Sequence, residues 1–153
     1  MVEISPEVVR FAAAQRYAIV GTVDADGTPH AACKGIVRME GGGRVYLIDL
    51  YSGRTSRNLA ANPRMSVTVV DEERFRGYCL KGSARVVERS EMDPALLEEW
   101  VGKISGRITH RIIRSVQGAM RHPGHPEALL PPPRRLIVLE VEEIVDLTRG
   151  RAE

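Results

Sequence analysis

The sequence predicts a mainly β fold, an antiparallel barrel that closes or nearly closes, with accessory helices around it. Five strand-like segments follow one another between residues 17 and 88, and most are joined by short reversals. Their alternating faces are half polar, which is typical of antiparallel strands. A sixth apolar segment at residues 136–147 ends the pattern. An open meander of such strands would leave unpaired edges, so a barrel is the favoured arrangement.

The first half of the chain alternates strands with turns after one short helix. Ser5, Pro6 and Glu7 fit an N-cap, a first helical residue and an acidic first turn, so a helix is expected to about residue 15. Strands are predicted at residues 17–23, 29–39, 44–50, 65–70 and 77–88. Gly82, inside the last of these, is expected to mark a bulge or a close backbone approach.

The second half predicts a helical insertion at about residues 93–121. Leu96, Trp100 and Ile104 recur at helical spacing, and a second helical segment is expected at about residues 107–120. Trp100 is expected to pack in the core or at an interface. Repeated prolines then predict an extended loop at about residues 122–134, before the closing strand.

Composition limits the class of protein. The chain has 153 residues, 43% hydrophobic and 27% charged, which fits one soluble globular domain spanning residues 1–153. An aromatic share of 5% and a net charge of +2 argue against base stacking and nonspecific nucleic-acid binding. Cys33 and Cys79 lie in separate predicted strands, so neither a disulfide framework nor a cysteine zinc site is expected. No signal peptide or spanning apolar run is visible, and a cytoplasmic location is expected.

The most informative stretch is the turn and helix start after the third strand. The apolar run ends at Ser52 and Gly53, and the predicted helix opens with Arg54, Thr55 and Arg57. Helix starts carry unpaired N–H groups and positive dipole charge, so acidic residues are usual there. Two arginines at this place indicate an anion site, and a phosphate is the usual guest. The alternative is a solvated turn in which Thr55 acts only as an N-cap.

Lys34 adds a second cation to this hypothesis. On a strand, His30, Ala32 and Lys34 share one face, where the small residues would leave room for a flat ligand. If the second and third strands are neighbours, Lys34 approaches the same site as Arg54. Together these residues indicate a site for a phosphate-bearing ring system.

Other candidate chemistry is weaker. Cys33 beside Lys34 suggests an activated thiol, but adjacent strand residues point to opposite faces. His122 and His125 lack further metal ligands nearby in the sequence, so no metal site is expected. A basic helix face is expected to be solvated rather than to bind nucleic acid; it comprises Arg107, His110, Arg111 and Arg114. No triad, Walker loop or dinucleotide fingerprint is present, and no catalytic residue can be named.

Several of these segments, taken in order, resemble the pyridoxamine 5'-phosphate oxidase-like, FMN-binding split-barrel family. The resemblance covers about residues 10–90 and rests on residues 24–30, 34–35, 53–64, 81–82 and 84–86. It implies a six-stranded antiparallel split β-barrel, a homodimer, and FMN held at the subunit interface. It also implies an FMN-dependent oxidoreductase or flavin reductase that takes a small-molecule substrate or an electron donor such as NAD(P)H.

The resemblance also implies the cofactor-binding residues. Lys34 matches the strand lysine near the flavin, with Ala32 and Cys33 beside it. Arg54 and Thr55 match the positions that hold the FMN phosphate, and Arg57 a basic residue that supports it. Ile48 and Asp49 match strand positions whose backbone lies along the flavin. Gly77 departs from the oxidase, which has a polar flavin partner there, and the C-terminal region differs too. A reductase is therefore favoured over the authentic oxidase, and the alternative is a flavin or haem carrier without turnover.

Overall fold

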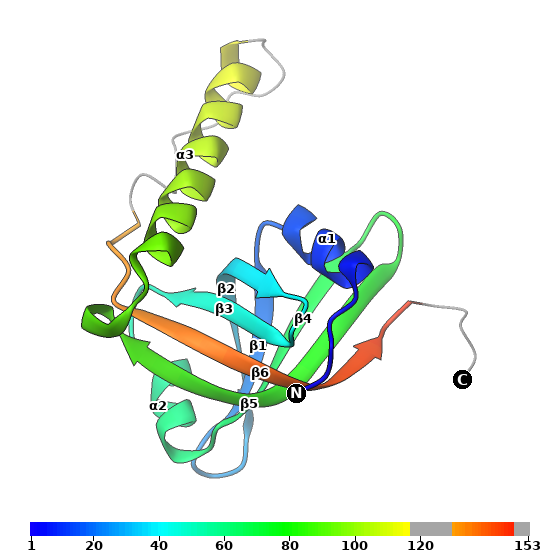
Figure 1. Cartoon of the computed structure of the whole chain (residues 1–153), viewed down its shortest axis with the longest axis vertical. Helices are drawn as coiled ribbons and strands as arrows, with labels where there is room; N and C mark the ends of the chain where they lie inside the picture. The colour runs from blue at the N-terminus through cyan, green and yellow to red at the C-terminus, as the bar shows by residue number, and fades with distance from the viewer. Residues whose placement is uncertain (117–129, 149–153) are drawn as a thin grey trace.

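The computed structural model describes the backbone of residues 1–116 and 130–148, and the side chains of residues 1–110 and 130–148. Within them six strands close an antiparallel barrel in the order β1-β2-β3-β6-β5-β4 (Figure 1). The strands are β1 Ala18–Val23, β2 Pro29–Glu40, β3 Arg44–Asp49, β4 Arg64–Asp71, β5 Arg76–Glu88 and β6 Arg135–Asp146. The predicted mainly β, six-stranded antiparallel barrel is confirmed.

The helices lie outside the barrel. They are α1 Pro6–Ala14, α2 Arg54–Ala61 and α3 Pro94–Val116, with a 3₁₀ turn, η1, at Arg89–Glu91. Figure 1 shows α2 at the opposite end of the barrel from α1, while α3 extends well beyond the strands. The Ser5 hydroxyl accepts a hydrogen bond from the Val8 N–H at 3.4 Å, which confirms the predicted cap of α1.

Two apolar clusters form the core. The larger fills the barrel and includes Val20, Leu47 and Ile137, while Val8 and Ala12 of α1 pack against one end of it. The smaller lies outside the barrel, where Leu96 and Trp100 of α3 pack on β2, β3 and β6 through Val37, Ile48, Leu136 and Val138. Strands β3 and β6 are thus covered on both faces, and α3 is anchored by its first half.

α3 corrects one prediction. Residues 94–116 form one continuous helix, whereas the sequence predicted a separate second helical segment from about residue 107. A glycine inside a helix costs about 1 kcal/mol relative to alanine, which packing readily offsets. Leu96, Trp100 and Ile104 all join the smaller cluster, which packs the first half of α3 on the barrel.

The predicted role of Gly82 is confirmed. The β5–β6 register shifts between Lys81 and Gly82. A Cβ atom at Gly82 would lie 1.9 Å from the Glu140 carbonyl oxygen, so only glycine fits there. The close approach lets β5 bend while it stays paired with β6.

Some predictions fall on residues outside the described range. These are His122, His125 and most of the proline-rich loop, and the side chains of Arg111 and Arg114 also lie outside it. Among the described residues, no helix is long and apolar enough to cross a membrane. Within the same part of the chain, no group of three metal-ligating side chains comes together.

Candidate functional site

The start of α2 has the features of an anion site. The N-cap is Gly53, which makes no side-chain capping bond, and the first turn contains no acidic residue. A Cβ atom placed on Gly53 would meet no heavy atom within 4 Å, so the space in front of the helix is open. The N–H groups of the first turn are therefore available to a ligand. Thr55 is not the N-cap, and the solvated-turn interpretation is wrong on this point.

The two arginines at the helix start are exposed, and within the described part of the chain only Arg54 has an ion pair. Arg54 Nη1 lies 3.4 Å from Asp24 Oδ2, and the Arg54 side chain is 57% exposed. A pair so exposed is worth at most about 1 kcal/mol, so Arg54 is easily recruited by a stronger anion. Arg57 is exposed and makes no ion pair with the residues described. Thr55, between them, is 2% exposed.

A buried polar network lies behind the helix start. Lys34 Nζ donates to Asp49 Oδ1 at 2.6 Å, and the Ser56 hydroxyl donates to the other carboxylate oxygen of Asp49. The pairing of Gly35 with Ile48 places Lys34 of β2 next to Asp49 of β3, as the hypothesis of neighbouring strands required. Burial raises the pKa of Asp49, but the bonds from Lys34 and Ser56 and the charge of Lys34 outweigh it, so the net shift is downward.

Asn58 fixes the other side of α2. Its amide donates to Thr22 Oγ1 at 3.0 Å and to Asp24 Oδ1 at 2.8 Å. Because Thr22 and Asp24 lie at the end of β1 and in the following turn, Asn58 ties α2 to the β1–β2 hairpin, while Ser56 ties it to β3. The position of the helix start is therefore set by buried hydrogen bonds on two sides.

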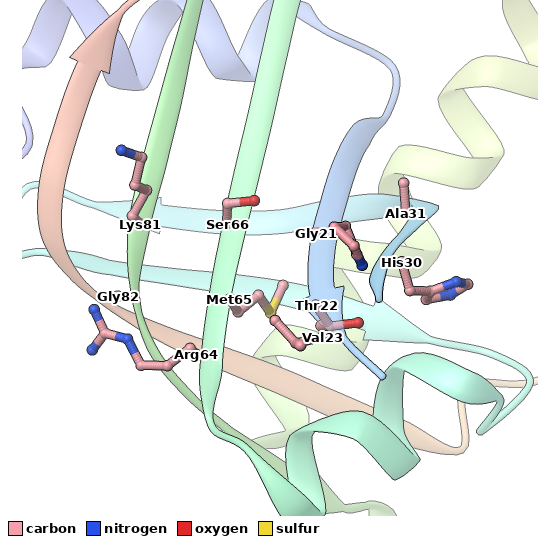
Figure 2. A pocket seen from close by; sticks show the side chains of 11 residues that line it. Gly21, Thr22, Val23, His30, Ala31, Arg64, Met65, Ser66, Lys81 and Gly82 are labelled. Atoms are coloured by element: carbon pink, nitrogen blue, oxygen red, sulfur yellow. The ribbon is translucent and has the colours of Figure 1, made fainter. Parts of the chain in front are cut away.

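A groove of about 410 Å³, here called the outer groove, lies beside this end of α2 on the outside of the barrel (Figure 2). Its floor is a cross-strand row in which Ala31, Gly21, Ser66 and Lys81 pair in turn from β2 to β5. Three of these four residues are small, so the floor is open enough for a flat ligand. Thr22 and His30 line its end next to α2.

A second hollow, the Trp100 pocket, lies at the other end of the outward face of β2. It measures about 180 Å³, and Cys33, Lys34, Ile48 and Trp100 contribute to its walls. The Trp100 ring packs over Gly35, where a Cβ atom would come within 2.4 Å of the indole. The outward residues Pro29, Ala31 and Cys33 of β2 run from the outer groove to this pocket.

The structure divides the predicted site residues into three groups. Cys33, Lys34 and Ile48 meet in the Trp100 pocket, and Asp49 joins them through Lys34. Arg54 and Arg57 flank the start of α2. Thr55 is buried, and Ala32 packs against the barrel core, so these two side chains face away from both hollows.

Sequence reasoning missed Ser56, Asn58 and the wall formed by Trp100. Ser56 and Asn58 are buried polar residues whose partners lie 7 and 36 positions away. Nothing in a short polar helix marks these pairings before the strand register is known. Helical periodicity did predict that Trp100 packs on the barrel, and the structure confirms it.

Comparisons with known proteins agree with this geometry. The family model described as pyridoxamine 5'-phosphate oxidase matches residues 4–147. No curated protein sequence matches at a significant level. HupZ from Group A Streptococcus has a similar structure, with 24% identity over 96% of each chain and a TM-score of 0.65.

Two further structures have the same fold. One is a Clostridium acetobutylicum protein related to general stress protein 26, with 17% identity over 95% of this chain and 92% of that one and a TM-score of 0.62. The other is an F420 reductase, with 17% identity over 93% of this chain and 98% of that one and a TM-score of 0.57. With a family model that matches nearly the whole sequence, the chain belongs to the pyridoxamine 5'-phosphate oxidase family.

Proposed function

We propose that this chain binds FMN as a homodimer and acts as an FMN-dependent oxidoreductase of the reductase type. The observation that carries the proposal is the start of α2. It is an open helix N-terminus with two exposed arginines and no acidic residue in its first turn. The buried network of Lys34, Asp49 and Ser56 holds this helix start against β2 and β3.

The residues present fit the phosphate of FMN at the start of α2 and the rest of the cofactor on the outward face of β2. The first N–H groups of α2, with Arg54 and Arg57, would hold the phosphate. The outward face of β2 at Ala31 and Cys33 would support the rest of the cofactor, next to the backbone of Ile48. When bound, FMN supplies the acceptor and donor of electrons, while the protein supplies binding and orientation.

Lys34 has a specific part in this proposal. Its ammonium uses one of three donors on Asp49, and its side chain, which is 11% exposed, lines the Trp100 pocket. Because Asp49 neutralises the charge, Lys34 would act as a fixed hydrogen-bond donor rather than as a free cation. Such a donor would orient an acceptor atom on the ring or on the substrate.

The homodimer is supported by exposed apolar side chains on one side of the barrel. Ile19 is 40% exposed, Val70 51% and Phe75 72%, and these lie on β1, β4 and the β4–β5 loop. Ile19 pairs across to Thr68 on β4, so they belong to neighbouring strands. A second subunit would remove this surface from water. Sedimentation is expected to show a dimer, and a stable FMN-bound monomer would contradict the proposal.

The chemistry proposed is electron transfer rather than acid–base catalysis. No described residue in the two hollows forms a paired general acid and base, so turnover would depend on the cofactor. The structural similarity to an F420 reductase supports a reductase. The same lack of a catalytic pair favours the second candidate, a flavin carrier without turnover.

Both cysteines are free, which suits the reducing cytoplasm that we propose as its location.

An absorption spectrum of the purified protein tests the cofactor. Flavin bands with FMN released on denaturation are expected, and a haem spectrum or failure to retain added FMN would contradict the proposal. Anaerobic addition of NADH or NADPH then separates the two candidates. Bleaching of the flavin bands at a catalytically useful rate supports the oxidoreductase, whereas no bleaching by either donor supports the carrier.

A further inference from the structure

The second half of α3, residues 105–116, extends past the barrel and is here called the distal half of α3. Figure 1 shows its last turns well clear of the strands. The apolar contact of α3 with the barrel ends at Ile104. Among the described residues, its last hydrogen bond to another segment runs from Arg107 to the carbonyl of Arg16. At about 1.5 Å per residue, the turns from residue 108 to residue 116 add about 14 Å of helix beyond that contact.

The composition of the distal half indicates that packing is needed to keep it helical. Besides Gly106 it contains the β-branched residues Ile108, Thr109, Ile112, Ile113 and Val116. Such residues have low helix propensity, and a helix this short is marginal in water by itself. The distal half also contains Arg107, Arg111 and Arg114 and no acidic residue. A surface that suits it would therefore offer apolar side chains together with carboxylates.

The chain has a surface of this kind away from its own α3. A groove of about 640 Å³, here called the acidic groove, is lined by the end of α1, the start of β1, the end of β4 and the β4–β5 loop. Its apolar residues include Ile19 and Val70, two of the exposed side chains that support the homodimer. No described residue of α3 lines it. In Figure 1, α1 lies between α3 and the β4–β5 loop.

The carboxylates of the acidic groove are only partly compensated. Asp71 is paired with Arg74 of the same loop at 3.3 Å. Glu72 and Glu73 are exposed, and neither makes an ion pair with any residue that the structure describes. Arg16 is the other basic residue that lines the groove, so a negative excess remains. Arginines from a second chain would balance it.

The loop that carries these carboxylates has a defined shape. The N–H of Arg74 donates to Asp71 Oδ1 at 3.1 Å, which closes the turn. Phe75 follows with a φ of 51°, in the left-handed region that disfavours a large side chain, and is 72% exposed. Strained backbone of this kind is typical of contact sites rather than of plain turns. The loop therefore adds an exposed aromatic ring next to the acidic groove.

We propose that the distal half of α3 docks in the acidic groove of a second copy of this chain, and that the contact forms twice in a two-fold symmetric dimer. The helix supplies arginines and β-branched residues, while the groove supplies Glu72 and Glu73 beside Ile19 and Val70. A two-fold axis makes the two contacts identical, so each helix and each groove has a partner. The inference rests on the proposed homodimer for its second copy, and it names the surfaces through which the copies meet.

The test reverses the charges on each side of the contact. The groove variant is Glu72→Lys, Glu73→Lys, and the helix variant is Arg111→Glu, Arg114→Glu. Each variant alone sets like charges against one another in both contacts, so sedimentation should show a dimer weakened at least about tenfold. Mixing the two variants should restore the dimer, because in a mixed pair both contacts join opposite charges. A tag on one variant should then recover the other in excess of random pairing.

The matched control is Glu91→Lys, Glu98→Lys. It makes the same change in net charge at two exposed carboxylates outside the acidic groove, and it should leave the dimer unchanged. Far-UV circular dichroism of every variant checks that the fold is kept. If the helix variant loses helicity, the groove variant alone decides, since its substitutions lie on an exposed loop.

Three results would overturn the docking. A dimer that is unchanged in the groove variant, or a mixture that pairs no better than the separate variants, would leave the homodimer standing and remove only this contact. A wild type that stays monomeric would refute the homodimer and the contact together. Absorption spectra of the same samples report bound flavin. A chain that pairs as expected without flavin would therefore contradict the proposed cofactor and not this inference.

Discussion

Replacing Asp49 by Asn should destabilise the protein by about 3 kcal/mol. Asp49 has no exposed side-chain surface, and its partner Lys34 is 11% exposed. Asparagine keeps the shape and can still accept from Ser56, but it leaves the ammonium buried without a countercharge. Removing one member of a buried pair costs about 3–5 kcal/mol, and the slight exposure of Lys34 places the expected value at the lower end.

The assay is urea unfolding at pH 7, in which the midpoint should fall while the m-value stays constant. Glu142→Gln is the matched control. It breaks the Arg64–Glu142 pair at 2.8 Å, whose side chains are 57% and 44% exposed, and should cost less than about 1 kcal/mol. The double variant Lys34→Met, Asp49→Asn should be less destabilised than the sum of its single variants. A loss below about 1 kcal/mol for Asp49→Asn, or strict additivity, would refute the account of the network.

The same pair gives a pH dependence with a definite sign. The folded state lowers the pKa of Asp49 below its ordinary value of 3.8. Burial raises this pKa, but the hydrogen bonds from Lys34 and Ser56 and the positive charge of Lys34 outweigh burial. The stability from this group is therefore complete above pH 3.8 and is lost as the pH falls through the lower, folded value. Acid should destabilise the wild-type protein more steeply than Asp49→Asn, and equal slopes would contradict the assignment.

Two further substitutions test the packing around the site. Gly82→Ala places a Cβ atom 1.9 Å from the Glu140 carbonyl oxygen and should cost at least about 3 kcal/mol in urea unfolding, whereas Gly42→Ala, with open space around it, should change little. Equal costs would contradict the close approach of β5 and β6. Trp100→Phe should lower the free energy of unfolding by about 2 kcal/mol yet leave FMN affinity nearly intact, because the ring packs on Gly35 and the smaller core cluster. A loss of FMN affinity without a loss of stability would place Trp100 in the cofactor site instead.

The sequence predicts the helices and strands of the barrel better than it predicts the side-chain contacts of the site. Local signals are enough for α1, where Ser5 caps the helix, and for Gly82, where a strand interior without a side chain indicates a close approach. These features depend on neighbours along the chain or on backbone geometry alone. The closing strand β6 is equally plain from its apolar run.

Local sequence signals could not predict the Lys34–Asp49–Ser56 network. Each residue suits several roles, and their meeting depends on the register in which β2 pairs with β3. Lys34 was therefore expected to offer a free cation, whereas its charge is compensated by Asp49. The continuous α3 shows a further limit, because tertiary packing overrides the local cost of glycine.

The measurement that bears most directly on the central claim compares FMN with riboflavin, which lacks the phosphate, in wild type, Arg54→Ala and Arg10→Ala. The ion pair that Arg54 makes with Asp24 at 3.4 Å is exposed, so its removal should leave the fold intact. If the start of α2 holds the phosphate, Arg54→Ala should weaken FMN by about 2–3 kcal/mol, the scale of a charge-assisted hydrogen bond, and leave riboflavin unchanged. Arg10→Ala, which replaces an exposed arginine of α1, should affect neither flavin. Unchanged FMN affinity in Arg54→Ala, or equal losses for both flavins, would contradict the account.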